Sequence, residues 1–246
     1  MRVNEDVFEP IDTGSEEFVP AESAWRQKWR GRMDAFGPAV AERFRLFREK
    51  APQDRGHDEM LQLVQRIFLA PAALVPKRVM FCGIDSNNSS QVCASVGHVL
   101  AEQTGSTVCL VDANMRDAPL SKLLDVDEEL LGYGKPHPWR EHCMLVRKNL
   151  FVAGTRVLEG ADGRLAPSSE IRERILSLSA SFEYLLFDAP GANKSADTAL
   201  LGQVAGSVVL VLEAKSTRKV QAKRAKERLE MANVRILGTV LNNHHS

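Results

Sequence analysis

The sequence has no excess charge of either sign, few cysteines and no long apolar run. Lysine and arginine total 32, and so do aspartate and glutamate, which argues against a globally basic nucleic-acid-binding protein. The four cysteines form no CxxC pair and mostly lie in apolar runs, which predicts buried thiols in a reducing compartment. No uncharged apolar run approaches the ~20 residues that cross a bilayer, and the first residues lack the pattern of a secretory signal. We therefore expect a cytosolic protein that is recruited to a membrane, if at all, by a partner.

The composition, 44% hydrophobic and 26% charged over 246 residues, suits one α/β domain with an appendage. We divide the chain into an acidic flexible tail (1–24), a basic aromatic helical extension (25–57) and a domain (58–246). The tail has seven acids against one base, whereas residues 25–55 have nine bases against four acids. A basic aromatic helix can lie on an anionic membrane, dock on a partner or pack on its own domain, and the sequence leaves these open.

The domain alternates apolar runs with helical patterns. After a helix over 58–69, the predicted strands are 79–84, 107–114, 182–191, 206–214 and 236–243, and the predicted helices are 90–102, 168–179, 195–204 and 218–232. Gly105 has the position of a helix C-terminal glycine. Continuous apolar strands between helices predict an α/β fold of three layers, with a mostly parallel sheet and helices on both faces. In such sheets, ligands bind outside the carboxyl ends of the strands.

Polar residues follow the first predicted strand in the spacing of a phosphate loop, GxxxxGK[ST]. Such a loop needs glycines for backbone approach, a lysine for the outer phosphates and a hydroxyl for magnesium. Gly83 matches the first glycine, Asn88 stands at the second, Ser89 replaces the lysine, and Ser90 supplies the hydroxyl. On composition alone, this segment is a polar turn between a strand and a helix, and a nucleotide site is only weakly indicated.

Two further strand ends carry motif residues. The second strand ends in Asp112, Asn114 and Arg116, and the third ends in Asp188. The order of all these segments resembles the bacterial tyrosine autokinases of capsule and exopolysaccharide synthesis, a branch of the MinD/ParA-like P-loop ATPases. In that family, the second strand carries a pattern similar to DxDxR. The third carries a pattern similar to DxxP, with Pro190 here one place early.

The resemblance covers residues 58–243 and implies a P-loop NTPase-like fold with the following roles. Asp112 would activate the attacking hydroxyl or order magnesium, and Asp188 and Ser90 would also serve the magnesium. The residues at cofactor-binding positions are Gly83, Asn88, Ser89, Ser90, Asn114, Arg116 and Asn242, the last where the family often contacts the base.

The departures from the family pattern fall on the residues that handle charge. Ser89 removes the lysine counter-charge, Asn88 is a poorer loop residue than glycine, and Asn114 removes the second acid of DxDxR. Phosphoryl transfer depends on positioning and electrostatics, and losing one preorganised stabiliser costs on the order of a hundred- to a thousandfold in rate. We predict an impaired kinase for which ATP and magnesium are weak ligands. The alternative is an active tyrosine kinase or MinD/ParA-type ATPase, with Lys194 or Arg116 as the replacement cation.

The resemblance also implies a partner, namely the cytosolic part of an inner-membrane polysaccharide co-polymerase or export protein. The family's ExxRxxR helix, which links subunits into a ring, appears as Glu59, Gln62 and Gln65. Because both arginines are glutamines, ring assembly is in doubt, although a homo-oligomer stays open. The family's terminal tyrosine cluster is absent, and only Tyr133 and Tyr184 could accept phosphate.

A basic run and several histidines complete the candidates. Residues 215–228 hold seven bases in fourteen positions. This run is either a solvated helix face or a contact for an acidic partner, phospholipid or DNA backbone, and no specific nucleic acid is expected. The spacing of His137, His142 and Cys143 matches no recognised metal-ligand pattern.

Overall fold

The computed structural model describes residues 55–69, 75–85, 89–126 and 142–242. The contacts divide the chain into Met1–Ala39 and Val40–Ser246, and all described residues belong to the second unit. The predicted tail and residues 25–54 of the predicted extension lie outside the described residues.

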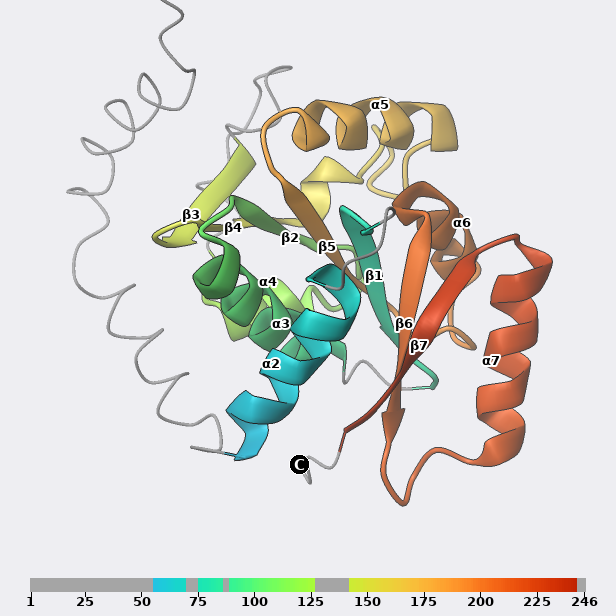
Figure 1. The fold of residues 1–246 in the computed structure, drawn as a ribbon. Coiled ribbons are helices and arrows are strands. Elements are labelled where there is room, and N and C mark those ends of the chain that lie inside the picture. The colour runs from blue at the N-terminus through green and yellow to red at the C-terminus, as the bar shows by residue number, and fades with distance from the viewer. Residues whose placement is uncertain (1–54, 70–74, 86–88, 127–141, 243–246) are drawn as a thin grey trace, which may run out of the picture. The chain divides into compact units, whose positions relative to one another are not determined.

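A sheet in the order β3-β4-β2-β5-β1-β6-β7 forms the centre of this unit (Figure 1). Its strands are β1 (Arg78–Gly83), β2 (Val108–Asp112), β3 (Cys143–Arg147), β4 (Leu150–Ala153), β5 (Tyr184–Ala189), β6 (Ser207–Glu213) and β7 (Arg235–Asn242). Neighbouring strands are parallel except for the β3–β4 pair, which is antiparallel. Because the parallel strands run in one direction, their carboxyl ends lie along the same end of the sheet.

Helices cover both faces of the sheet (Figure 1). They are α2 (Arg55–Phe68), α3 (Ser89–Thr104), α4 (Pro119–Leu123), α5 (Ser168–Ser179), α6 (Asp197–Ala205) and α7 (Lys219–Met231), with a 3-10 turn η3 (Thr155–Val157). The layer of α2, α3 and α4 lies on one face, and the layer of α5, α6 and α7 lies on the other. The predicted α/β fold with three layers and a mostly parallel sheet is thereby confirmed.

The burial of β1 shows why the strand sequences are continuously apolar. Val79 and Phe81 belong to the core cluster under α2 and α3, while the Met80 side chain reaches toward Gly202 of α6. Side chains alternate between the faces of a strand, and both faces are covered here, so the buried positions from Val79 to Cys82 are all apolar. The four cysteines are free and buried, which confirms the expectation of buried thiols.

The described part of the sheet has seven strands rather than the five that we predicted from the sequence. The additional strands are β3 and β4, and α4 was also not predicted. The other boundaries agree within a few residues; α2 begins at Arg55, three residues before the predicted start. Gly105 has a φ of 66° and donates its N–H to the Ala101 carbonyl of the last α3 turn at 3.1 Å, as a C-terminal glycine does. Within the described residues, no helix is both long enough and apolar enough to span a bilayer.

Candidate functional site

Asp112 and Asp188, predicted from separate motifs, lie next to each other at the carboxyl edge of the sheet. The two residues are paired in the parallel register of β2 and β5, and both are 0% exposed. The main chain joins the same positions, because the Ala113 N–H donates to the Asp188 carbonyl at 2.8 Å. The site therefore holds two carboxyl groups in a water-excluded setting.

The Asp188 carboxyl is held by the first residue of α3. Ser89 Oγ donates to Asp188 Oδ1 at 2.7 Å, whereas Oδ2 is buried and makes no hydrogen bond to another described residue. Burial raises the pKa of Asp188 to about 7, the nearby Ser90 and Ser89 hydroxyls partly oppose this, and the charge of Asp112 adds to it. Burial therefore favours the protonated form of this carboxyl more than it is favoured in an exposed aspartate.

The Asp112 carboxylate accepts hydrogen bonds from main-chain donors. Its Oδ2 accepts the Ser121 N–H at 2.7 Å, and its Oδ1 accepts the Asn114 N–H at 3.3 Å. The chain reaches this geometry through Ala118, which has a left-handed φ of 39° just before α4. Hydrogen bonds to a carboxylate favour its ionised form, so the two acids have different surroundings.

The end of β1 is tied to the loop that follows β5. The Gly83 carbonyl accepts the Ala192 N–H at 2.9 Å, and the Ile84 carbonyl accepts the Asn193 N–H at 3.0 Å. Ser89 and Ser90 begin α3 and are both buried. Asn88 lies outside the described residues. The predicted phosphate-loop residues that are described thus gather beside Asp188.

A cavity of about 270 Å³ opens between the loops that follow β2 and β5. Its lining includes Asn114, Arg116, Lys194 and Asp197. The structure therefore brings both candidate replacement cations, Arg116 and Lys194, to one cavity, and both side chains are exposed. Asn114 is only 2% exposed, and its Nδ2 group makes no hydrogen bond to a described residue.

Hydrogen bonds that no sequence pattern predicts connect α7 to the loop beside this cavity. Asn193 Nδ2 donates to the Gln221 carbonyl at 3.1 Å, and Arg228 Nη1 donates to the Asn193 carbonyl at 3.1 Å. Two residues of α7 therefore hold the loop that carries Lys194. Contacts between a side chain and a distant carbonyl follow no periodicity, so a sequence pattern cannot predict them.

No family model matches the chain. Among curated proteins, it is 27% identical over 157 residues to tyrosine-protein kinase YwqD of Bacillus subtilis, a match that covers 62% of this chain and 66% of the kinase. The chimerical protein CapA2B2 superposes with a TM-score of 0.65 and 19% identity, covering 80% of this chain and 89% of that one. The kinase domain of Escherichia coli tyrosine kinase ETK gives a TM-score of 0.65 and 20% identity, covering 80% and 82%.

The chain has the fold of bacterial tyrosine kinase domains. The resemblance predicted from the motif order is therefore confirmed, and it extends to the MinC:MinD cell division protein complex of Aquifex aeolicus, with a TM-score of 0.53 and 16% identity over 68% of this chain. At such identities, the solved structures establish the fold alone.

The oxygen ligands at this site suit magnesium better than they suit a triphosphate. Asp112, Asp188 and the Ser90 hydroxyl provide the oxygen ligands that magnesium prefers, and the unpaired Asp188 Oδ2 is free to serve as one. The triphosphate needs positive charge at the phosphate loop, where Ser89 offers only a hydroxyl that already donates to Asp188.

The remaining predicted residues are more scattered in the kinase-like fold. Asn242 ends β7 at the same edge of the sheet, and its carbonyl accepts the Ala214 N–H at 2.9 Å. Tyr184 is 6% exposed and packs edge-on against Phe68 with ring centroids 5.6 Å apart, so it is a core residue; Tyr133 lies outside the described residues. Glu59, Gln62 and Gln65 are exposed on α2.

Proposed function

We propose that the chain is a kinase-like protein of exopolysaccharide or capsule biosynthesis whose phosphoryl transfer is impaired. It acts as the cytosolic partner or regulator of an inner-membrane polysaccharide co-polymerase or export protein. One observation carries the impairment: Ser89, at the place of the phosphate-loop lysine, donates its hydroxyl to Asp188 at 2.7 Å.

The impairment is electrostatic in origin. Catalysis of phosphoryl transfer consists almost entirely of positioning and charge stabilisation. Here the two carboxyl groups of Asp112 and Asp188 are buried side by side, and the neutral Ser89 stands in place of the cation that would offset the phosphates. A pKa of about 7 for Asp188 further weakens magnesium at neutral pH, because the proton must leave first. ATP and magnesium are therefore weak ligands under this proposal.

The role as a partner rests on similarity and on the surface of α2. Proteins with this fold include bacterial tyrosine kinases, and the family to which we compare the motifs works beside membrane polysaccharide proteins. Gln62 and Gln65 lie exposed where that family has arginines, so ion pairs of the family's ring cannot form there. We propose that this chain uses the fold for binding, either to the membrane partner or in a homo-oligomer of another geometry.

A second candidate function is an active ATP-dependent tyrosine kinase or MinD/ParA-type ATPase. The cavity beside the site favours it, because Arg116 and Lys194 both line that cavity. Either cation could offset the charge of a phosphate group.

Calorimetric titration with ATP and magnesium separates the two functions. We expect little binding to the wild-type protein. The double variant Asn88→Gly/Ser89→Lys restores the loop pattern and should gain on the order of tenfold to a hundredfold in affinity, the effect of one or two charge-assisted hydrogen bonds. The matched control Gln91→Lys adds the same charge at an exposed position of α3 and should gain nothing.

Tight binding of ATP and magnesium by the wild-type protein would contradict the proposal that phosphoryl transfer is impaired. If that binding is lost in Asp112→Ala and Asp188→Ala, the site is a working nucleotide site. If it is also lost in Lys194→Gln but not in the exposed control Lys122→Gln, the replacement cation of the second function is identified. Binding to the purified cytosolic segment of a co-polymerase encoded nearby tests the partner role separately.

A further inference from the structure

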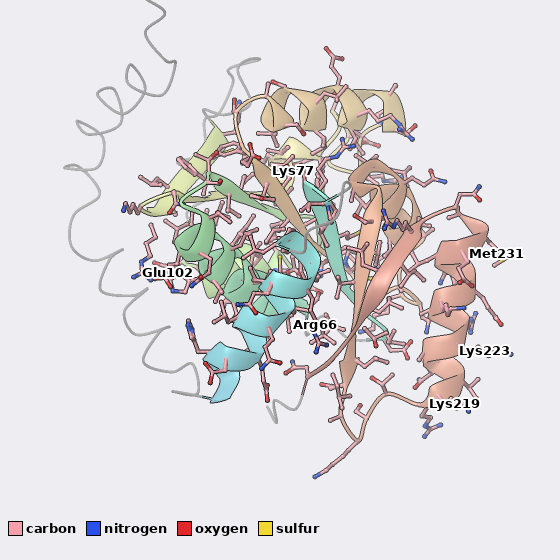
Figure 2. All side chains as sticks on the ribbon, in the orientation of Figure 1. Arg66, Lys77, Glu102, Lys219, Lys223 and Met231 are labelled. Atoms are coloured by element: carbon pink, nitrogen blue, oxygen red, sulfur yellow. The ribbon has the colours of Figure 1, made fainter. Side chains whose placement is uncertain are left out.

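The outer surface of α7 combines basic side chains with two exposed apolar ones. We define this α7 surface as Lys219, Val220, Lys223, Arg224 and Met231, all exposed. Val220 is 78% exposed and Met231 is 77% exposed. Figure 2 shows Lys219, Lys223 and Met231 projecting from α7 away from the sheet.

The spacing of the apolar pair places both side chains along one line of the helix. Val220 and Met231 are eleven positions apart, which is about three turns and about 16 Å along the axis. The opposite face of α7 buries Ala225 and Leu229 against the sheet layer. The exposed pair is therefore not part of the core stripe of this amphipathic helix.

The exposed charge along α7 is net positive. Four bases, Lys219, Lys223, Arg224 and Lys226, are exposed, against two exposed acids, Glu227 and Glu230. The acids pair within the helix, Glu227 with Lys223 at 3.7 Å and Glu230 with Lys226 at 2.8 Å. Such exposed pairs contribute little and break readily. Lys219 and Arg224 add further positive charge to the surface, which attracts an anionic partner.

We propose that the α7 surface binds an anionic lipid bilayer directly, with Val220 and Met231 entering the headgroup region and the bases contacting the lipid phosphates. Two apolar side chains far apart on one line suit a flat, fluid interface, where each is buried separately between headgroups. A protein partner usually requires its apolar anchors clustered at the centre of the contact. A nucleic-acid backbone recognises the bases but gains nothing from the valine and methionine.

This contact is separate from the site that the proposed function uses. It holds whether or not phosphoryl transfer is retained. Because α2 lies on the opposite face of the sheet from α7, a bilayer on α7 leaves α2 free for the polysaccharide partner or a second copy.

Sedimentation of the full chain with vesicles tests the proposal. Vesicles of phosphatidylglycerol and phosphatidylcholine should bind the wild-type protein, and those of phosphatidylcholine alone should not. The variants Lys219→Gln/Lys223→Gln/Arg224→Gln and Val220→Ser/Met231→Ser should each weaken binding about tenfold or more. The matched controls Lys122→Gln/Lys148→Gln/Arg172→Gln and Leu176→Ser change exposed residues elsewhere and should bind as the wild type does.

A fluorescent reporter makes the result independent of any other basic segment. The native thiols are buried, so an environment-sensitive dye can be attached selectively to Met231→Cys in the full chain. We expect a blue shift with anionic vesicles, and none for the same dye on Leu176→Cys. An unshifted Met231→Cys dye, or loss of vesicle binding by the controls alone, would overturn the proposal. Binding to duplex DNA that survives Val220→Ser/Met231→Ser, without vesicle binding, would also overturn it.

Discussion

Asp112 and Asp188 place two carboxyl groups side by side without any exposed surface. Like charges in a low dielectric repel, so one of the two groups retains its proton more strongly. Asp112 accepts main-chain N–H groups, whereas Asp188 has a buried oxygen without a hydrogen-bond partner among the described residues. Burial, with a smaller contribution from the charge of Asp112, raises the pKa of Asp188 to about 7.

The first prediction concerns the pH dependence of stability. The native pKa of Asp188 is about 7 and the unfolded value is about 3.9, so the folded chain binds this proton more tightly. The free energy of unfolding should therefore fall as the pH rises from about 4 to 7, by up to about 4 kcal/mol on an order-of-magnitude basis, and level off above. Asp188→Asn should remove this decline and exceed the wild type in stability at pH 8. Urea unfolding at pH 5 and pH 8 measures both.

The control for this prediction is Asp197→Asn, which changes an exposed acid of the neighbouring cavity. It should leave the pH dependence of the wild type intact. If Asp188→Asn declines with pH as steeply as the wild type does, burial of this carboxyl is not the source of the dependence.

At the scale of elements, the close approach of α3 to β2 depends on a glycine. A Cβ atom at Gly97 would lie 2.5 Å from Leu110 Cδ2 and 3.5 Å from Leu150 Cδ1. Leu110 is 0% exposed, so its side chain has little room to turn away in a densely packed core. Glycine therefore occurs at the centre of this helix despite its poor helix propensity, because close packing against the sheet outweighs that propensity.

The second prediction follows from this contact. Gly97→Ala should destabilise the protein by about 1–2 kcal/mol, because overpacking outweighs the gain in helix propensity. Adding Leu110→Ala should produce a double variant that is less destabilised than the sum of the single variants. Chemical denaturation of the four proteins measures the coupling. A stabilised Gly97→Ala protein would mean that the α3–β2 interface relaxes freely.

The sequence predicted those elements whose two faces are buried, and it missed those at the edge of the sheet. β1 and β5 are long apolar runs because helices cover both of their sides. β3 and β4 are shorter, and a tight turn joins them as an antiparallel pair. Their combined segment contains the charged residues of the turn and edge, so periodicity is weak there. α4 spans five residues, too few for a helical pattern.

The same distinction applies to the candidate site. Asp112 and Asp188 follow strands that the sequence identifies, and parallel strands bring their carboxyl ends together. The contact of Ser89 with Asp188 depends on the rotamer of one hydroxyl. The link from Arg228 to Asn193 joins residues 35 positions apart. Neither contact can be predicted from the composition or from the spacing of residues, because each depends on the folded structure.

For the whole molecule, α7 connects two regions with different proposed roles. Its outer surface is the proposed bilayer contact, and its inner side holds the loop after β5 through Asn193. That loop in turn bonds to the end of β1 and lines the cavity beside the carboxyl pair. A change in the position of α7 should therefore reach the site through one chain of hydrogen bonds.

The last prediction tests that chain of hydrogen bonds. Arg228→Ala removes a charge-assisted bond to the Asn193 carbonyl, which contributes about 1.5–3 kcal/mol to holding the loop. The amides of Ala192 and Asn193, which donate to the end of β1 at 2.9 and 3.0 Å, should then exchange with solvent at least about tenfold faster. The control Arg224→Ala removes the same charge from the exposed side of α7 and should leave both amides protected. Native-state hydrogen exchange resolved at single amides measures this effect. Equal exchange in the two variants would show that the Arg228 bond does not hold the loop, and that bilayer binding on the helix could not be transmitted to the site through Arg228.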